Sequence, residues 1–276
     1  ISYLYKKRKD LEISIVEEGA GEYYKDEITF YSLHKYIILY ESLLSLLVFL
    51  PLRRKKLLER IRCAYVYNPA LFSLNPYPKL IKIPQITPKN EIVYNLLLLE
   101  QKNMDTSEYT KRDYYYFVSG DGVKSNYEDV ILEIETMLSI VSEKQLLIKE
   151  HPKFSNNCDH PFEEMFPEIF VDRRNYLFES LYISLDLDKK VLITDGSAAV
   201  LHPKYIFNKE PYIIFTYRLM SKVKNNLKKR YYEDLYVAYA DNTKLYVPEN
   251  LDEFKNVIFE IERRKYQNNL NEYPDS

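Results

Sequence analysis

The stretch VLITDGSAAVL, residues 191–201, decides the fold class of this chain of 276 residues. Its first four residues are apolar or β-branched, which is typical of a buried strand. The turn Asp195-Gly196-Ser197 ends this run, and serine is a preferred first residue for a helix. The sequence therefore predicts a strand, a tight turn and a helix over about 198–207, the repeating unit of a parallel α/β sheet.

Other segments extend this pattern in both directions. Apolar runs typical of strands lie at 11–16, 114–118, 145–148 and 212–215. Helices are expected at about 127–141, 176–185 and 251–266, the first with apolar residues at helical spacing. The alternation predicts an α/β protein with mainly parallel sheets of Rossmann type, in which ligands bind beyond the carboxyl ends of the strands.

A proline-rich stretch indicates where the chain divides. Residues 61–112 contain five prolines and short runs of both helical and strand character. We expect one domain with its linker over 1–104, and a second Rossmann-like domain plus a C-terminal helix over 105–276. Only one convincing strand precedes residue 35, so the first domain is expected to be incomplete. The chain begins at Ile1 without methionine or a signal-peptide pattern, as a fragment would.

Composition and short motifs narrow the function. The net charge of −2 gives no reason to expect a nucleic-acid partner. The two cysteines suggest no disulfide framework, and no Cys/His set has zinc spacing, so no metal is expected. Walker, G-x-G-x-x-G and G-x-S-x-G patterns are missing from the sequence, which leaves P-loop, nicotinamide and α/β-hydrolase sites without support.

The chain has only five glycines, in three clusters, and two of these clusters flank candidate chemistry. Glu17-Glu18-Gly19 follows the 11–16 run, and a carboxylate there can act as a general base; a solvated acidic loop is the alternative. Gly196 and Ser197, with Ala198, can cap a helix and bind an anion, or form an ordinary N-cap. The turn Gly120-Asp121-Gly122 follows the 114–118 run and faces the same edge, although turn glycines are often only structural.

Three of the four histidines precede proline, and position separates them. His151-Pro152 directly follows the 145–148 run, where an imidazole can donate hydrogen bonds to phosphate oxygens. A structural turn histidine is the alternative there. His160 lies in a polar loop and His202 in or beside a short helix, so both are interpreted as structural.

The most apolar stretch, residues 36–50, is followed by the basic residues 53–56. It is shorter than the roughly 20 residues of a membrane span. A buried helix with a basic end is one interpretation, and an interfacial helix that contacts anionic lipid through 36–56 is the other. The second would place a cytoplasmic protein at the inner face of a bacterial cytoplasmic membrane.

The order of these motifs resembles the bacterial GT-B sialyltransferases, which carry a D/E-D/E-G motif, an HP motif and an S-S/T-type motif. The matching positions are Glu17-Glu18-Gly19, His151-Pro152 and Gly196-Ser197-Ala198. The chain looks closest to the lipooligosaccharide sialyltransferases and polysialyltransferases, over residues 11–220. The resemblance implies two Rossmann-like domains facing a cleft, and a metal-independent transfer of sialic acid from CMP-sialic acid to a hydroxyl of a capsule or lipooligosaccharide glycan.

The resemblance also implies residue roles. Glu17 or Glu18 would be the base on the acceptor hydroxyl, and His151 would hold the CMP phosphate. Ser197 and the backbone around Ala198 would bind the same phosphate, and Glu179 would hold the ribose hydroxyls, unless it is an exposed helix glutamate.

Two other functions stay open. The segment Ile193-Thr194-Asp195-Gly196-Ser197, together with the HP pair, is also similar to CDP-glycerol polyol-phosphate polymerases of teichoic acid synthesis. A non-catalytic binding protein of capsule assembly is the third possibility. The alanine at position 198, where the sialyltransferases prefer a second hydroxyl residue, puts one phosphate contact in doubt.

Overall fold

The computed structural model describes seven parts of the chain, and the fold is built from them: residues 13–16, 61–69, 79–118, 127–151, 162–174, 178–219 and 226–272. They belong to two compact units, Ile1–Gln85 and Ile86–Ser276. Each unit has its own parallel sheet, so each is described by itself.

In unit 1 the described residues form a three-stranded parallel sheet. Its strands are β1 (Ile13–Val16), β2 (Ile61–Val66) and β3 (Leu80–Lys82), in the order β1-β2-β3. Ala64 and Val66 of the central strand are almost fully buried. The Ser14 hydroxyl lies 3.2 Å from the Cys63 thiol and links the first two strands.

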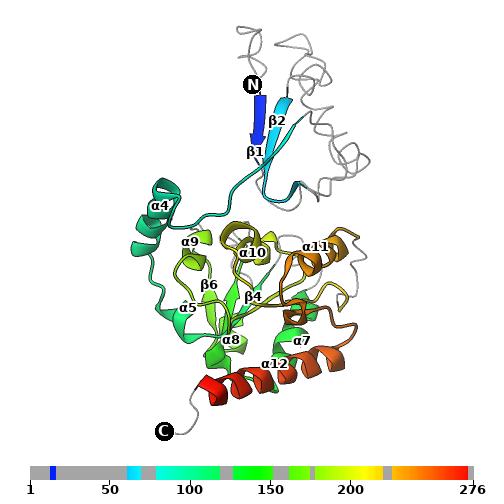
Figure 1. Cartoon of the computed structure of the whole chain (residues 1–276). Helices are drawn as coiled ribbons and strands as arrows, with labels where there is room; N and C mark the ends of the chain where they lie inside the picture. The colour runs from blue at the N-terminus through cyan, green and yellow to red at the C-terminus, as the bar shows by residue number, and fades with distance from the viewer. Residues whose placement is uncertain are drawn as a thin grey trace, which may run out of the picture. The chain divides into compact units, whose positions relative to one another are not determined.

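Unit 2 contains a six-stranded parallel sheet in the order β6-β5-β4-β7-β8-β9 (Figure 1). The strands are β4 (Tyr114–Phe117), β5 (Leu146–Lys149), β6 (Phe170–Asp172), β7 (Val191–Thr194), β8 (Tyr212–Phe215) and β9 (Leu245–Tyr246). Every residue of β4, β5, β7 and β8 is buried, as expected for strands covered on both faces. Counted along the chain, the order is 3-2-1-4-5-6, the order of the doubly wound Rossmann fold.

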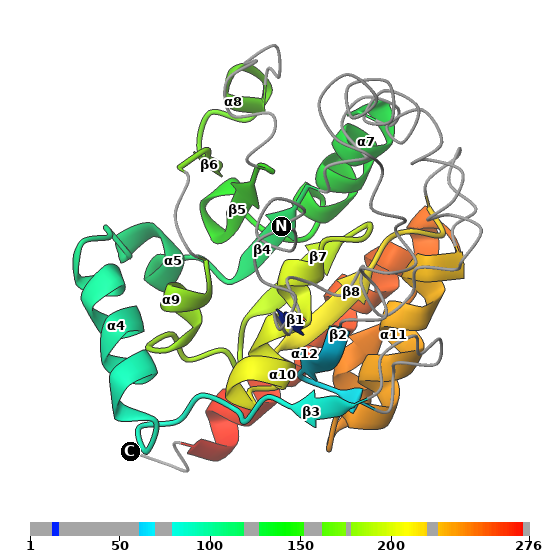
Figure 2. The same ribbon diagram turned by 90° about the horizontal axis from the view of Figure 1, so that it is seen from above.

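Helices cover both faces of this sheet (Figure 2). On one face, α7 (Tyr127–Leu138) and α12 (Leu251–Glu272) pack against the side chains of alternate strand residues such as Tyr116 and Ile193. On the other face, α5 (Ser107–Lys111) and α9 (Glu179–Tyr182) contribute Tyr109 and Tyr182 to a group of edge-to-face aromatic rings. The result is a three-layer α/β/α unit.

The other helices of the described ranges are two longer ones, α4 (Glu91–Lys102) and α11 (Asn226–Ala238), and two short ones, α8 (Phe162–Met165) and α10 (His202–Phe207). The 3₁₀ turns in the same ranges are η3 (Glu143–Gln145), η4 (Ala198–Val200) and η5 (Asn242–Lys244). Pro203 stands in the first turn of α10, and Asn208 ends that helix with a positive φ of 54°. Ser142 and Gln145 form a capping box on η3, which directs the chain into β5.

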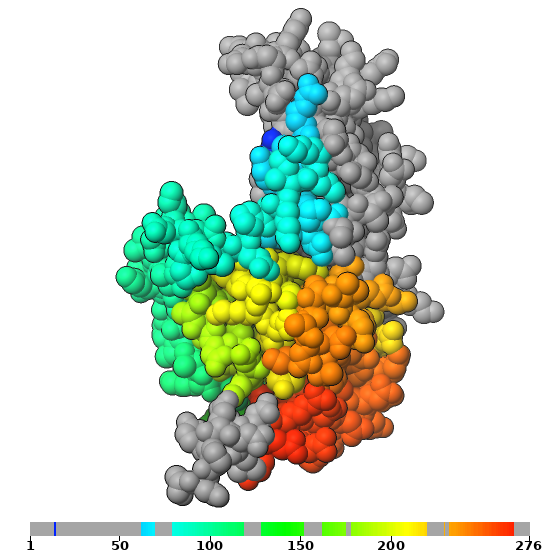
Figure 3. Space-filling model, in the orientation of Figure 1, coloured from blue at the N-terminus to red at the C-terminus, as the bar shows by residue number. Residues whose placement is uncertain are grey.

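The strands predicted at 11–16, 114–118, 145–148, 191–194 and 212–215 are confirmed to within two residues. The two units divide within the proline-rich stretch 61–112, as expected, and β2, β3, α4 and α5 also lie in this stretch. The units divide after Gln85, before the expected boundary at 104, because α4 packs against α9. Figure 3 shows α4 at the margin of unit 2, where Ile92 is 78% exposed.

Among the helices that the structure describes, none is both long and apolar enough to cross a membrane. The segment 36–56, expected to contact anionic lipid or to form a buried helix, lies outside the described residues.

Candidate functional site

The carboxyl edge of the unit 2 sheet brings several predicted site residues together. Phe117 pairs in register with Lys149 of β5 and with Thr194 of β7, so the ends of these three strands form one row. The chain order reverses at β4, since β5 and β6 lie on one side of it and β7 on the other. Such a reversal is where doubly wound sheets bind ligands.

The turn after β7 lies at this reversal and is shaped by the Thr194 hydroxyl. Thr194 Oγ1 accepts hydrogen bonds from the backbone N–H of Gly196 at 3.0 Å and of Ser197 at 2.8 Å. The same hydroxyl donates to the carbonyl of Phe117 at 3.0 Å, which ties the turn to β4. The Ser197 hydroxyl accepts the N–H of Ala199 at 3.4 Å and so caps η4.

This bonding changes what the turn can offer an anion. Thr194 takes the N–H groups of Gly196 and Ser197, two of the residues expected to bind an anion. Within the described ranges no acceptor is recorded for the Ala198 N–H. The turn can therefore present the Ala198 N–H and the Ser197 hydroxyl proton, a smaller set of donors than the sequence predicts.

His151 stands two residues beyond β5, on the opposite flank of β4 from this turn, and is half-buried. The preceding residue, Glu150, is buried and accepts two hydrogen bonds from Arg173, at 2.9 and 3.2 Å. Lys149 Nζ donates 2.6 Å to the carbonyl of Arg174 and lies 3.6 Å from Asp172 Oδ2. These contacts fix the exit of β5 and hence the position of His151.

Burial and a neighbouring charge have opposite effects on the pKa of Lys149, the last residue of β5. Burial lowers the pKa of Lys149, while the Asp172 carboxylate opposes that shift. Asp172 is itself fully buried and also accepts from the Arg174 side chain at 2.9 Å. A network of this kind holds a loop in one arrangement, because breaking any member leaves an unpaired buried charge.

Glu179 begins α9 and contacts His202, which begins α10. The two side chains are only 19% and 20% exposed, so Glu179 is not an exposed helix glutamate. Burial raises the pKa of Glu179, but the His202 imidazole and a backbone N–H outweigh it and hold the pKa below its usual value. Glu179 is therefore a carboxylate at neutral pH.

A buried acidic cluster lies beneath the reversal point. The Tyr116 hydroxyl donates 2.6 Å to Glu133 Oε2, and both residues are fully buried. The Thr216 hydroxyl faces this pair without the geometry of a full hydrogen bond. Burial raises the pKa of Glu133 to about 8, and the Asp195 carboxylate adds to the shift while Tyr116 opposes it. Glu133 is largely protonated near neutral pH.

We predict that Glu133→Gln removes part of the pH dependence of stability. The Glu133 pKa is about 8 in the folded protein and about 4.5 in the unfolded chain, so the folded state binds more protons between these values. Stability then falls as pH rises through this window. Glutamine cannot ionise, so the variant should be more stable than wild type at pH 8 by about 3 kcal/mol, and by much less at pH 5.

Urea unfolding at pH 5, 6.5 and 8 measures this difference. Glu128→Gln is the matched control, because Glu128 is exposed on the same helix. Identical pH profiles for wild type and Glu133→Gln would contradict a proton held at this position.

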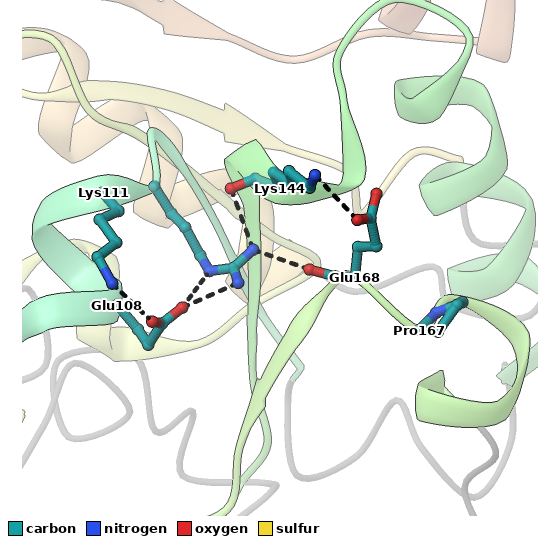
Figure 4. A pocket seen from close by; sticks show the side chains of 6 residues that line it. Glu108, Lys111, Lys144, Pro167 and Glu168 are labelled. Carbon is teal, nitrogen blue, oxygen red and sulfur yellow. Dashed lines mark hydrogen bonds and ion pairs between the residues drawn. The ribbon is translucent and has the colours of Figure 1, made fainter.

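A pocket of about 560 Å³ lies at the amino ends of the strands, opposite to the carboxyl ends described above (Figure 4). Arg112, Lys144 and Glu168 line it, and they precede β4, β5 and β6 in the chain. Arg112 Nη1 donates to four backbone carbonyls at 3.0–3.2 Å. Lys144 is paired with Glu168 at 3.0 Å. Arg112 and Lys144 are therefore already paired with protein groups. Their contacts connect the segments that enter the amino ends of β4, β5 and β6.

Seven of the predicted site residues lie outside the ranges that the structure describes. They are Glu17, Glu18, Gly19, Gly120, Asp121, Gly122 and Pro152.

Sequence reasoning interpreted His202 as structural, and it gave no separate role in the site to Thr194 or Glu133. The signal for His202 was its place five residues after Ser197, in the same strand–turn–helix segment. The signal for Glu133 was its place between Val130 and Ile134 on the apolar face of a helix, where a carboxyl group must find a buried partner.

No family model, no curated protein and no solved structure matches this chain.

Proposed function

We propose that the chain is an inverting sialyltransferase that moves sialic acid from CMP-sialic acid to a hydroxyl of a bacterial surface glycan. The observation that carries the proposal is the strand order of unit 2. It brings the Ser197 turn to the reversal point and His151 to the other flank of β4, at one edge of one sheet. A nucleotide phosphate is the ligand that this edge of a doubly wound sheet most often binds.

The chemistry follows from the donor. CMP-sialic acid carries its own leaving group, and the C–O bond to the phosphate breaks as the acceptor oxygen attacks from the opposite side. Hydrogen-bond donors aimed at the phosphate favour departure, and Ser197, the Ala198 N–H and His151 supply them. A carboxylate of Glu17 or Glu18 takes the proton of the attacking hydroxyl. The sequence resemblance supports this choice of donor over CDP-glycerol.

We predict that CMP protects the protein against heat. At a CMP concentration of 100 times Kd, binding adds about 2.7 kcal/mol to stability and raises Tm by roughly 5–10 °C. His151→Ala and Ser197→Ala should each weaken CMP binding about tenfold, because each removes a hydrogen-bond donor to the phosphate. His160→Ala is the matched control, since His160 also precedes a proline but was assigned no ligand.

Differential scanning fluorimetry with CMP, UMP, AMP and CDP-glycerol measures the protection. Stronger protection by CDP-glycerol than by CMP would favour the polyol-phosphate polymerase. Protection by no cytidine nucleotide would favour the non-catalytic binding protein and overturn the proposal.

A further inference from the structure

The pair formed by Glu179 and His202 is held in place from both sides. The Tyr182 hydroxyl, one turn along α9, donates 3.1 Å to the carbonyl of Ala199 in η4. Lys209, just beyond α10, donates to three carbonyls at the end of α9, at 2.7, 3.2 and 2.8 Å. These bonds fix α9 against the segment that runs from the Ser197 turn into α10, so the contact between the pair is not that of two mobile surface side chains.

The chemistry of the pair determines how the imidazole is oriented. Glu179 contacts His202 Nδ1, and its low pKa keeps it a carboxylate, which can only accept a hydrogen bond. The carboxylate favours a proton on Nδ1, although the contact lacks the geometry of a full hydrogen bond, and Nε2 can donate to a phosphate oxygen once it also carries a proton. No hydrogen bond to Nε2 is recorded within the described ranges. A carboxylate on one ring nitrogen and an open second nitrogen is how proteins present an imidazole to a ligand or a proton.

The place of His202 in the fold indicates which ligand it meets. It is the fifth residue after Ser197, and the segment between them leaves β7 at the reversal point of the sheet. His151 leaves β5, on the other side of β4. At roughly 4.8 Å per strand, β5 and β7 are about 10 Å apart, which leaves room for a phosphate between their exits.

We infer that His202 is a phosphate-binding residue of the nucleotide site, with Glu179 as its positioning residue. The inference rests on the proposed function and deepens it, because it adds an imidazole to the side of the phosphate opposite His151. The ligand class is a phosphate ester of a nucleoside. Glu179 then serves the phosphate through His202, where the sequence resemblance assigned it to the ribose.

Because Nε2 donates to a phosphate oxygen only while it carries a proton, the test of this site includes pH. Glu179 of α9 contacts His202, α9 also carries Tyr182, and η4 carries no titratable side chain. On α10 itself, Lys204 is paired with Glu210. The Tyr182 pKa lies well above its usual value because the ring is buried, so this hydroxyl stays neutral. Glu179 is thus the charged group of α9 that contacts the imidazole.

The test compares CMP with cytidine by isothermal titration calorimetry from pH 5.5 to 8.5. His202→Gln should weaken CMP binding about tenfold at pH 6, leave cytidine binding unchanged and make the pH dependence of CMP binding shallower. Because every variant meets the same ligand at each pH, the titration of the phosphate itself cancels in the comparison. His160→Gln is the matched control.

Glu179 variants separate the two roles of that carboxylate. If Glu179 acts through His202, Glu179→Gln should weaken CMP and spare cytidine, and Glu179→Asp should recover part of the loss. If it binds only the ribose, CMP and cytidine should weaken equally and the pH profile should keep its wild-type slope, which would overturn the positioning role.

Unchanged CMP affinity and pH profile in His202→Gln would overturn the inference while leaving the proposed function standing. Failure of wild type to bind any cytidine nucleotide would instead sink the proposed function. In that case the binding of AMP and inorganic pyrophosphate tests the inference. Wild-type binding of either ligand that is lost in His202→Gln supports it. Failure of the wild type to bind either ligand overturns it.

Discussion

Valine at position 194 is expected to destabilise unit 2 by roughly 3 kcal/mol and to abolish CMP binding. The Thr194 hydroxyl makes three hydrogen bonds: it accepts from the N–H groups of Gly196 and Ser197 and donates to the carbonyl of Phe117. Thr194 is fully buried, so water cannot replace the lost partners. Each lost bond costs about 1 kcal/mol, and the turn loses the acceptor that shapes it.

Thr194→Ser is the matched control for this prediction, because it keeps the hydroxyl and removes only a buried methyl group. It should cost about 1 kcal/mol and retain protection by CMP. Thr194→Val should lower Tm by roughly 6–12 °C. Equal Tm values and equal CMP protection for the two variants would show that the hydroxyl does not organise the turn.

The largest effect on turnover is expected from the acidic pair. Glu17→Gln with Glu18→Gln should lower the rate of transfer by about 10²–10⁴-fold, the usual contribution of a general base. Under the proposed function CMP should still protect the double variant, because the base would act on the acceptor and unit 2 would bind the nucleotide. The single variants identify which of the two glutamates is the base.

Glu27→Gln is the control for charge in this acidic part of the chain. Normal turnover in both single variants and in the double variant would remove the assignment of the base. Loss of CMP protection in the double variant would show that the glutamates act on nucleotide binding instead.

The parallel sheet of unit 2 could be predicted because its strands are short apolar runs with polar turns after them. The runs YYYF, LLIK, VLIT and YIIF are buried on both faces, and such continuous apolar runs are what a parallel sheet requires. β6 and β9 were missed because they have only three and two residues and lie at the sheet edges. β2 was missed because it lies in the proline-rich stretch 61–112 and Arg62 interrupts its apolar run.

The site was predictable only as far as local sequence determines it. His151, Gly196 and Ser197 follow strands in sequence, so their edge of the sheet was foreseeable. The contact of Glu179 with His202 was not, because it joins two helices 23 residues apart and depends on how α9 packs against η4. Nor could the sequence show that Thr194 takes N–H groups that a phosphate would otherwise bind.

The measurement that tests the central claim most directly is a transfer assay with CMP-sialic acid and a panel of glycan acceptors. The account predicts release of CMP together with an acceptor that gains the mass of one or more sialic acid residues. Both should be lost in Thr194→Val and in the double glutamate variant. Consumption of CDP-glycerol while CMP-sialic acid stays intact, or consumption of neither donor with any acceptor, would contradict it.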